Sequence, residues 1–239
     1  MNTDLGFHSY KIFSNTIQEW DLFDSKERYE ENLNKNFNLL KSNNWIDKKI
    51  TYKFNGDGFR SFEFDADTDS ILFLGCSLTF GTGLPLEETA GYLISQKLKL
   101  RFFNLGLGGT SNDTAFRFGY HYISTLKPKI VIMFSPENSR IELCENQKIF
   151  YYRSQMKFYQ MDSFYKKWLL DDTNSFLNQQ KNILAIENIC ITNNIKFLCF
   201  DAPKLFLIDF KVTNDFARDL IHPGIKTHQL VSEFVLGQI

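Results

Sequence analysis

Hydrophobic positions change their spacing near residue 65 of the chain. From Ser70 onward, short continuous apolar runs alternate with amphipathic stretches of helical period. Runs of this length are typical of parallel strands that are buried on both faces. We expect strands at Ile71–Leu74, Arg101–Leu105, Lys129–Phe134 and Lys196–Phe200. We expect helices at Glu87–Leu98, from the cap Thr110–Asp113 to Leu126, and at Thr173–Asn193. This alternation predicts a three-layer α/β sandwich with a parallel sheet.

The first 65 residues follow other patterns. A helix is expected around Ser25–Ser42, where apolar residues at helical spacing should face a core: Tyr29, Leu33, Phe37 and Leu40. The alternating runs Ile50–Phe54 and Phe59–Phe64 flank the turn sequence Asn55–Gly58, which predicts a β-hairpin. We therefore expect a helix and β-hairpin appendage over residues 1–65, packed on a main domain over residues 66–239. For the polar, aromatic stretch Glu137–Asp172 the pattern predicts no element.

Composition and charge exclude several classes of function. Lys and Arg number 27 against 28 Asp and Glu, for a net charge of -1, so a nucleic-acid partner is not expected. The apolar runs are far shorter than the ~20 residues of a membrane-spanning helix. The start of the chain, Met1–Gly6, lacks the basic and apolar regions of a secretory signal, which favours a cytoplasmic location.

The cysteines and histidines suggest neither disulfides nor a metal. The four cysteines are scattered, with no CxxC pair, as expected of free thiols in a reducing compartment. His8, His121 and His228 have no acidic or cysteine partners at ligand spacing, so no metal site is expected.

Candidate chemistry lies in the loops that follow the expected strands, because open α/β sheets bind ligands at the carboxyl ends of their strands. Gly75–Gly83 carries Ser77 directly after a strand, but it matches neither the GxSxG elbow nor a P-loop. Ser77 is then either a structural turn residue or a nucleophile. The second loop, Asn104–Asp113, is rich in glycine before a helix, which suits an oxyanion or a phosphate.

A third candidate lies near the C-terminus, in Arg218–Gly224. Asp219 precedes His222 by three residues, and Pro223 and Gly224 follow in a turn. The Asp219 carboxylate can bind imidazole Nδ1, which leaves Nε2 to accept a proton from a serine hydroxyl. The same spacing also arises in a surface carboxylate beside a loop histidine.

Taken together, these three motifs resemble the SGNH (GDSL-type) hydrolase family in order and spacing over about residues 50–239. Asn55–Arg60 and Gly81–Thr89 also resemble family segments around the first block. The resemblance implies a flavodoxin-like sandwich that cleaves esters without metal or cofactor. It implies that Ser77 is the nucleophile, that Asp219 and His222 complete a triad, and that Gly109 and Ser77 supply backbone oxyanion donors.

The sequence departs from the family pattern in two blocks. Cys76 replaces the aspartate before the serine, and it is a second, less favoured candidate nucleophile. The third block should carry an asparagine whose amide is a further oxyanion donor, but an ungapped comparison places Glu137 there. One extra loop residue would bring Asn138 into that place, and Asn112 beside the glycine loop is the other candidate.

The leading hypothesis is therefore a serine-dependent ester (acyl) hydrolase that acts on a small or carbohydrate-linked ester. One alternative is a binding or structural module on the same fold with a decayed site. Another is an O-acyltransferase that uses the same triad. The expected partner is a small-molecule or glycan ester, with neither nucleic acid nor membrane, and the sequence does not fix the oligomeric state.

Overall fold

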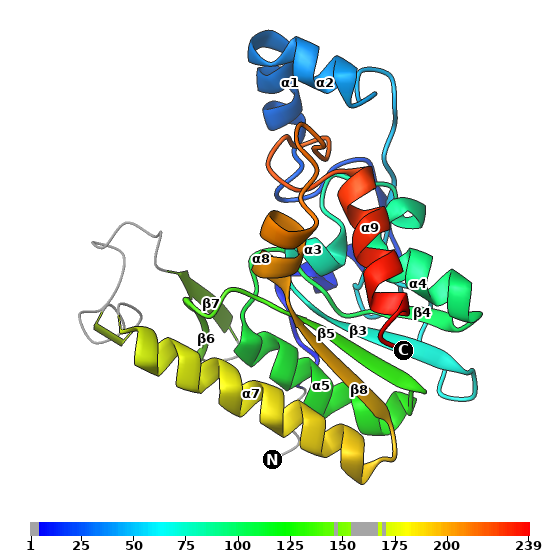
Figure 1. Cartoon of the computed structure of the whole chain (residues 1–239), viewed down its shortest axis with the longest axis vertical. Helices are drawn as coiled ribbons and strands as arrows, with labels where there is room; N and C mark the ends of the chain where they lie inside the picture. Colours follow the sequence, from blue (N-terminus) through cyan, green and yellow to red (C-terminus); the bar gives the residue numbers. More distant parts are fainter. Residues whose placement is uncertain (1–4, 146–147, 154–166, 169–170) are drawn as a thin grey trace.

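A four-stranded parallel sheet forms the centre of the protein (Figure 1). The computed structural model describes residues 5–145, 148–153, 167–168 and 171–239. The strand order is β4-β3-β5-β8, with the bounds β3 Ser70–Gly75, β4 Arg101–Asn104, β5 Ile130–Ser135 and β8 Lys196–Asp201. All three pairings are parallel. The predicted α/β sandwich with a parallel sheet is confirmed, and the four expected strands match within about a residue at each end.

Helices cover both faces of this sheet (Figure 1). On one face lie α4 (Ala90–Leu98) and α9 (Ile225–Leu236), and on the other lie α5 (Asn112–Leu126) and α7 (Asp172–Thr192). Successive strand residues alternate between the two resulting cores, as the pleat requires. Leu72 and Leu74 pack with α5 and α7, while Ile71 and Phe73 pack with α4 and α9.

Short elements connect these layers. A four-residue helix, α3 (Ser77–Phe80), follows β3 directly. A 3-10 turn, η2 (Leu86–Glu88), precedes α4, and α8 (Ala202–Lys204) runs into the π-helical stretch η4 (Leu205–Asp209) after β8. Two antiparallel strands, β6 (Arg140–Glu145) and β7 (Lys148–Arg153), form a hairpin for which the sequence predicts no element. Residues 154–166 and 169–170 of the same unassigned stretch lie outside the described residues.

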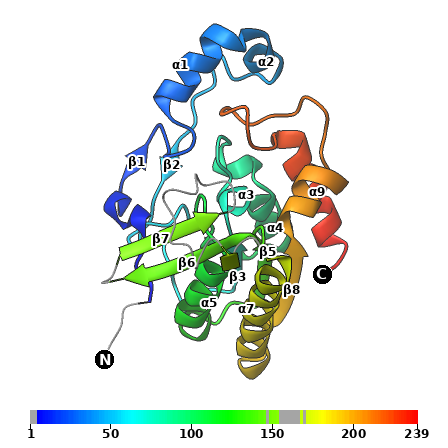
Figure 2. The ribbon, with the colours of Figure 1, turned by 90° about the vertical axis from the view of Figure 1, so that its left-hand side faces the viewer.

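The N-terminal part contributes to the main core. It contains η1 (Ser9–Phe13), β1 (Ile17–Gln18), α1 (Lys26–Lys35), α2 (Phe37–Ser42) and β2 (Tyr52–Lys53). Figure 2 shows α1 and α2 beyond the β1–β2 pair, at the far end from the large helices. Buried side chains from this part belong to the same cluster as the strand residues Leu72 and Leu74: Tyr10, Leu40, Trp45, Ile50, Tyr52, Phe54 and Phe59.

The expected single helix over Ser25–Ser42 is broken in two. Ser25 caps α1 through its hydroxyl, as a helix start requires. At Asn36 the backbone leaves the helical region, with φ -132° and ψ 28°. The break rotates the following residues, so Leu40 is buried whereas Phe37 is exposed. The prediction that the whole apolar stripe faces the core is therefore wrong at Phe37.

The predicted β-hairpin is also wrong. The turn over Asn55–Gly58 forms, closed by the Gly58 N–H donating to the Asn55 carbonyl at 3.0 Å. However, β2 pairs with β1, and Phe59–Phe64 forms no strand. The reason is Arg60, whose fully buried guanidinium donates to the carbonyls of the loop that follows α3. This side chain ties the segment to the loop that follows α3, and it also lies 4.3 Å from the centre of the Tyr52 ring of β2.

Candidate active site

Ser77 lies where the buried strand β3 turns sharply into α3. Gly75 ends the strand with φ +154°, and a Cβ atom there would lie 2.6 Å from the Phe134 carbonyl oxygen. Only glycine fits such a close approach of two backbones. The turn places Ser77 at the first position of α3, with its side chain at the carboxyl edge of the sheet. In Figure 1, α3 lies above the ends of β3 and β5.

The structure brings Ser77, His222 and Asp219 into one hydrogen-bonded chain. His222 Nε2 lies 2.9 Å from Ser77 Oγ, and His222 Nδ1 lies 2.6 Å from Asp219 Oδ2. The other carboxylate oxygen, Asp219 Oδ1, accepts the backbone N–H groups of Ile221 and His222 at 3.1 and 3.0 Å. These two bonds fix the plane of a fully buried carboxylate, while the imidazole stays partly accessible. Such an arrangement lets the imidazole take a proton from the serine hydroxyl.

The loop that carries Asp219 and His222 is closed on itself and held against α3. The Ala217 N–H donates to the His222 carbonyl at 2.9 Å, and Leu220 adopts φ +55° to complete the turn. The Arg218 N–H donates to the Gly83 carbonyl at 2.9 Å. Gly83 has φ +74°, and a Cβ there would lie 2.9 Å from the Ala217 Cβ. Gly83 thus permits the close contact that joins the serine loop to the histidine loop.

Residues from the N-terminal part hold the same loop from its other side. The Arg218 guanidinium forms a buried ion pair with Asp24 at 2.7 Å and lies 4.0 Å from the centre of the Trp20 ring. The Tyr52 hydroxyl donates to Asp24 at 2.6 Å, and Asn32 Nδ2 donates to the Asp219 carbonyl at 3.3 Å. The sequence analysis missed these residues. No local spacing could reveal them, because Asp24 and Arg218 are 194 positions apart.

The glycine loop is tied to β3 and α3 by side chains. Asn104 is fully buried, donates through Nδ2 to the Thr79 carbonyl at 3.2 Å, and accepts the Gly106 N–H at 2.9 Å. Thr110 Oγ1 donates to the Gly75 carbonyl at 3.1 Å. Gly109 has φ +76° and is partly exposed. Its proposed role as an oxyanion donor stays a prediction.

The two candidate asparagines occupy different environments. Asn112 is fully buried at the start of α5, where Nδ2 donates to the Pro136 carbonyl at 3.1 Å and Oδ1 accepts the Ser135 hydroxyl at 2.8 Å. These bonds give Asn112 a structural task, since they join α5 to the end of β5. Asn138 lies in the turn before β6 and is partly exposed. Neither has been tested as an oxyanion donor, and both roles stay predictions.

Cys76 and Glu137 both contact other parts of the protein. Cys76 is buried in the apolar cluster between the sheet and α4 and α9, whereas the Ser77 hydroxyl contacts the His222 imidazole. The Glu137 carboxylate lies 3.5 Å from the Arg140 guanidinium. Glu137 therefore pairs within its own loop, and Cys76 packs in an apolar core.

A second histidine, His228, is buried behind the site on α9. Its Nδ1 accepts the Ala90 N–H at 3.1 Å, which satisfies a free donor at the start of α4. Burial, together with the neighbouring His222, lowers the pKa of His228 to about 3. His228 is therefore neutral at physiological pH and serves as a helix-capping acceptor.

Within the described residues, no group of three or more His, Cys, Asp and Glu side chains could hold a metal ion. No helix in the same part of the chain is long and apolar enough to cross a membrane.

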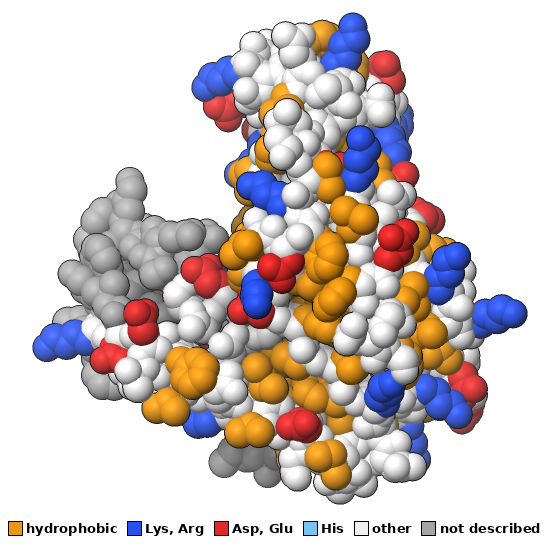
Figure 3. All heavy atoms as spheres, in the orientation of Figure 1, with side chains coloured by type: hydrophobic (Ala, Val, Ile, Leu, Met, Phe, Trp, Pro, Cys, Tyr) orange, Lys and Arg blue, Asp and Glu red, His pale blue; other side chains and the backbone are white. Residues whose placement is uncertain are grey.

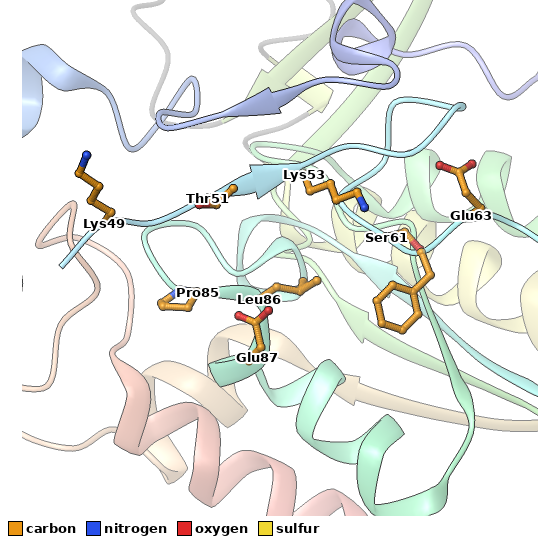
Figure 4. Close-up of a pocket in the computed structure, with 9 residues that line it drawn as sticks. Lys49, Thr51, Lys53, Ser61, Glu63, Pro85, Leu86 and Glu87 are labelled. Atoms are coloured by element: carbon orange, nitrogen blue, oxygen red, sulfur yellow. The ribbon is translucent and has the colours of Figure 1, made fainter.

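A cavity of about 420 Å³ lies between the segment around β2 and the turn η2 (Figure 4). Figure 4 shows Lys49, Thr51 and Lys53 on one side, with Pro85, Leu86 and Glu87 on the other. Ser77, Asp219 and His222 are not among its lining residues. The cavity is therefore separate from the hydrogen-bonded chain described above.

Comparisons with known proteins found likenesses among solved structures alone. No family model matches the chain, and no curated protein matches it. Among solved structures it is similar to a putative lipolytic protein of the G-D-S-L family from Desulfitobacterium hafniense, with 14% identity over 71% of this chain and 99% of that one, at a TM-score of 0.39. It is also similar to the psychrotrophic esterase EstA from Pseudoalteromonas, with 15% identity over 71% of this chain and 95% of that one, at a TM-score of 0.38. A third similar structure is the acetyl xylan esterase Est2A from Butyrivibrio proteoclasticus, with 10% identity over 71% of this chain and 63% of that one, at a TM-score of 0.40.

Proposed function

We propose that this protein is a serine-dependent ester hydrolase of the SGNH type, with Ser77, His222 and Asp219 as its catalytic triad. The observation that carries the proposal is the continuous chain of short contacts, 2.9 Å from Ser77 Oγ to His222 Nε2 and 2.6 Å from His222 Nδ1 to Asp219 Oδ2. A serine that only stabilises a turn needs no contact with an imidazole. A histidine that only packs in a loop needs no buried carboxylate held in a fixed orientation. The three together are what nucleophilic catalysis at a carbonyl requires.

The first chemical step forms an acyl enzyme. Ser77 Oγ attacks the ester carbonyl carbon while its proton passes to His222 Nε2. The Asp219 carboxylate stabilises the imidazolium and holds Nδ1–H in place. The carbonyl oxygen becomes an oxyanion, which the N–H groups of Ser77 and Gly109 stabilise. His222 then gives the proton to the departing alkoxide, and the alcohol leaves.

Water completes the reaction by the same route. His222 takes a proton from the water molecule as its oxygen attacks the acyl carbon, and returns that proton to Ser77 Oγ as the carboxylic acid leaves. The Asn138 amide is the proposed third donor to the oxyanion. The loss of one such donor costs ~10²–10³-fold in kcat, so this residue decides how active the enzyme is.

The surroundings of the glycine loop favour a small acyl group. The Phe23 ring lies against this loop, and a Cβ on Gly109 would lie 3.2 Å from the Phe23 Cζ atom. An aromatic wall this close to the proposed oxyanion donor leaves limited room for a long acyl chain. A short acyl group on a small alcohol or on a sugar hydroxyl fits this restriction.

Fluorophosphonate labelling tests the nucleophile directly. The folded wild-type protein should be labelled, and Ser77→Ala should abolish labelling, because the probe phosphonylates only an activated serine. Cys76→Ala is the matched control, since it changes the neighbouring side chain and should leave labelling intact. Absence of labelling in folded wild type would indicate the decayed binding module, and labelling of Ser77→Ala would identify another nucleophile.

Turnover of an activated short-chain ester tests the rest of the triad. Asp219→Asn should lower kcat by about 10⁴-fold, because the imidazole then loses the partner that sets its tautomer. His222→Gln should be at least as damaging. A decrease of less than tenfold in either variant would contradict the proposed proton transfer.

A further inference from the structure

The sheet has an open edge at β8. This strand pairs with β5 on its inner side, and no strand in the described ranges pairs with its outer side. Its four central residues are partly exposed, whereas every residue of β3 and β5 is buried. Figure 2 shows β8 as the outermost strand of the sheet, between α7 and α9. An edge of this kind presents backbone groups that can bind another strand.

The register fixes which backbone groups point outward. The Lys196 N–H donates to the Lys129 carbonyl beside β5, so Lys196 and every second residue after it face inward. The N–H and C=O groups of Phe197, Cys199 and Asp201 therefore point away from the sheet. An antiparallel neighbour must align outward-pointing residues with outward-pointing residues.

This rule selects one pairing of β8 with a second copy of itself. With a twofold axis at Cys199, Cys199 faces its own copy, and Phe197 faces Asp201 of the second copy. All three outward-pointing residues are then paired on both strands. If the twofold axis passed through Leu198 instead, the residue opposite Asp201 would lie outside β8, and Asp201 would have no partner within the strand.

Exposed apolar side chains flank the edge on both faces of the sheet. On α7, Leu177, Leu184 and Ile191 are 52%, 61% and 68% exposed and recur every seven residues, which places them in one stripe. On the other face, Ile208 of η4 and Phe234 of α9 are exposed. Figure 3 shows hydrophobic side chains gathered along α7, over β8 and on towards α8 and α9.

The stripe of α7 points to the side where a second copy would lie. Asn178 and Asn182 bind Asp113 of α5 from the opposite side of the helix. Since α5 covers β3 and α7 covers β8, the side of α7 away from α5 is the side of the open edge. A twofold axis perpendicular to the sheet would set the two α7 helices antiparallel, stripe against stripe, near Leu184.

We propose that this protein forms a homodimer through β8, in which the two sheets join into one of eight strands. An interface of this kind is self-complementary, as twofold dimers require. Stable interfaces bury ~800 Å² per partner, and the five apolar side chains that flank the strand, 37–71% exposed, supply apolar area on both faces of the sheet. A net charge of -1 per chain opposes the association of two copies very little. The dimer does not depend on the proposed hydrolysis.

Sedimentation of the full chain at 1–100 μM tests the dimer. Wild type should have twice the 28.0 kDa mass of one chain. The double variant Leu184→Glu/Ile191→Glu should weaken dimerisation by at least about 100-fold, because each buried carboxylate costs about tenfold or more. Ile12→Glu, at an equally exposed apolar residue outside the patch, is the matched control and should remain dimeric.

Amide hydrogen exchange tests the pairing itself. The N–H groups of Phe197, Cys199 and Asp201 should exchange more slowly at 100 μM than at 1 μM, because each gains a partner in the dimer. A monomer at 100 μM would overturn the proposal and leave the edge for a different protein. A dimer that the double variant does not weaken would also overturn the proposal. The same holds for a dimer in which these three amides exchange as fast as they do in the monomer.

Discussion

The ion pair between Asp24 and Arg218 should be among the most costly single interactions to remove. Both side chains are at most 2% exposed, and the guanidinium makes three contacts with the carboxylate, at 2.7–3.2 Å. Asp24→Ala leaves the Arg218 charge buried with no counter-ion and no access to water. Removing one partner of a buried pair costs about 3–5 kcal/mol. The Tyr52 hydroxyl also loses its acceptor, so we expect the upper part of that range.

Urea unfolding at neutral pH, followed by tryptophan fluorescence, measures this loss. Trp20 stacks on the Arg218 guanidinium and should report the change directly. Glu31→Ala is the matched control, because it removes a carboxylate from the 2.7 Å pair with Lys35, whose side chains are 60–70% exposed. That change should cost little stability, because solvent screens an exposed ion pair. If the two variants lose equal stability, or if Asp24→Ala loses less than about 1 kcal/mol, burial does not set the strength of this pair.

Four further substitutions test other parts of the structure. Burial lowers the pKa of folded His228 to about 3, below the ~6.5 of an unfolded histidine. As the pH falls, the unfolded chain therefore binds a proton at this histidine before the folded chain does. Acidification from pH 7 to 5 should lower the free energy of unfolding by about 2 kcal/mol. In chemical denaturation, His228→Gln should remove this loss. Asn138→Ala should lower kcat by ~10²-fold or more at constant KM. Asn112→Ala should instead lower the melting temperature, because the Asn112 amide joins α5 to the end of β5. Gly83→Ala should destabilise by about 1–3 kcal/mol in urea, given its φ of +74° and the crowding at its Cβ. Equal behaviour of variant and wild type would contradict each of these.

The central sheet could be predicted from the sequence because its signals are local. Ile71–Leu74 is apolar throughout and Lys196–Phe200 is apolar after its first residue, a pattern typical of a strand in a sheet that is covered on both faces. The serine and histidine loops were recognisable for the same reason, since each is a short motif at a strand end or in a turn. Their meeting at 2.9 Å follows from the topology that those strands impose.

Other features depend on partners that are distant in sequence. The run Phe59–Phe64 has the alternation of a strand, but burial of the Arg60 guanidinium among the carbonyls of another loop overrides it. The break at Asn36 that exposes Phe37 has no Pro or Gly to announce it. The roles of Asp24 and Asn32 were invisible because they exist only once the two ends of the chain meet.

That meeting has a consequence for the order in which the molecule assembles. The loop with Asp219 and His222 rests on residues almost 200 positions earlier, so it closes one of the largest loops in the chain. The entropy of such a closure is recovered only when both segments are already folded, which makes this contact a late event. We therefore expect the sheet and Ser77 to form before the loop with Asp219 and His222 docks. In the hydrolase that we propose, activity would then appear only with this final docking step.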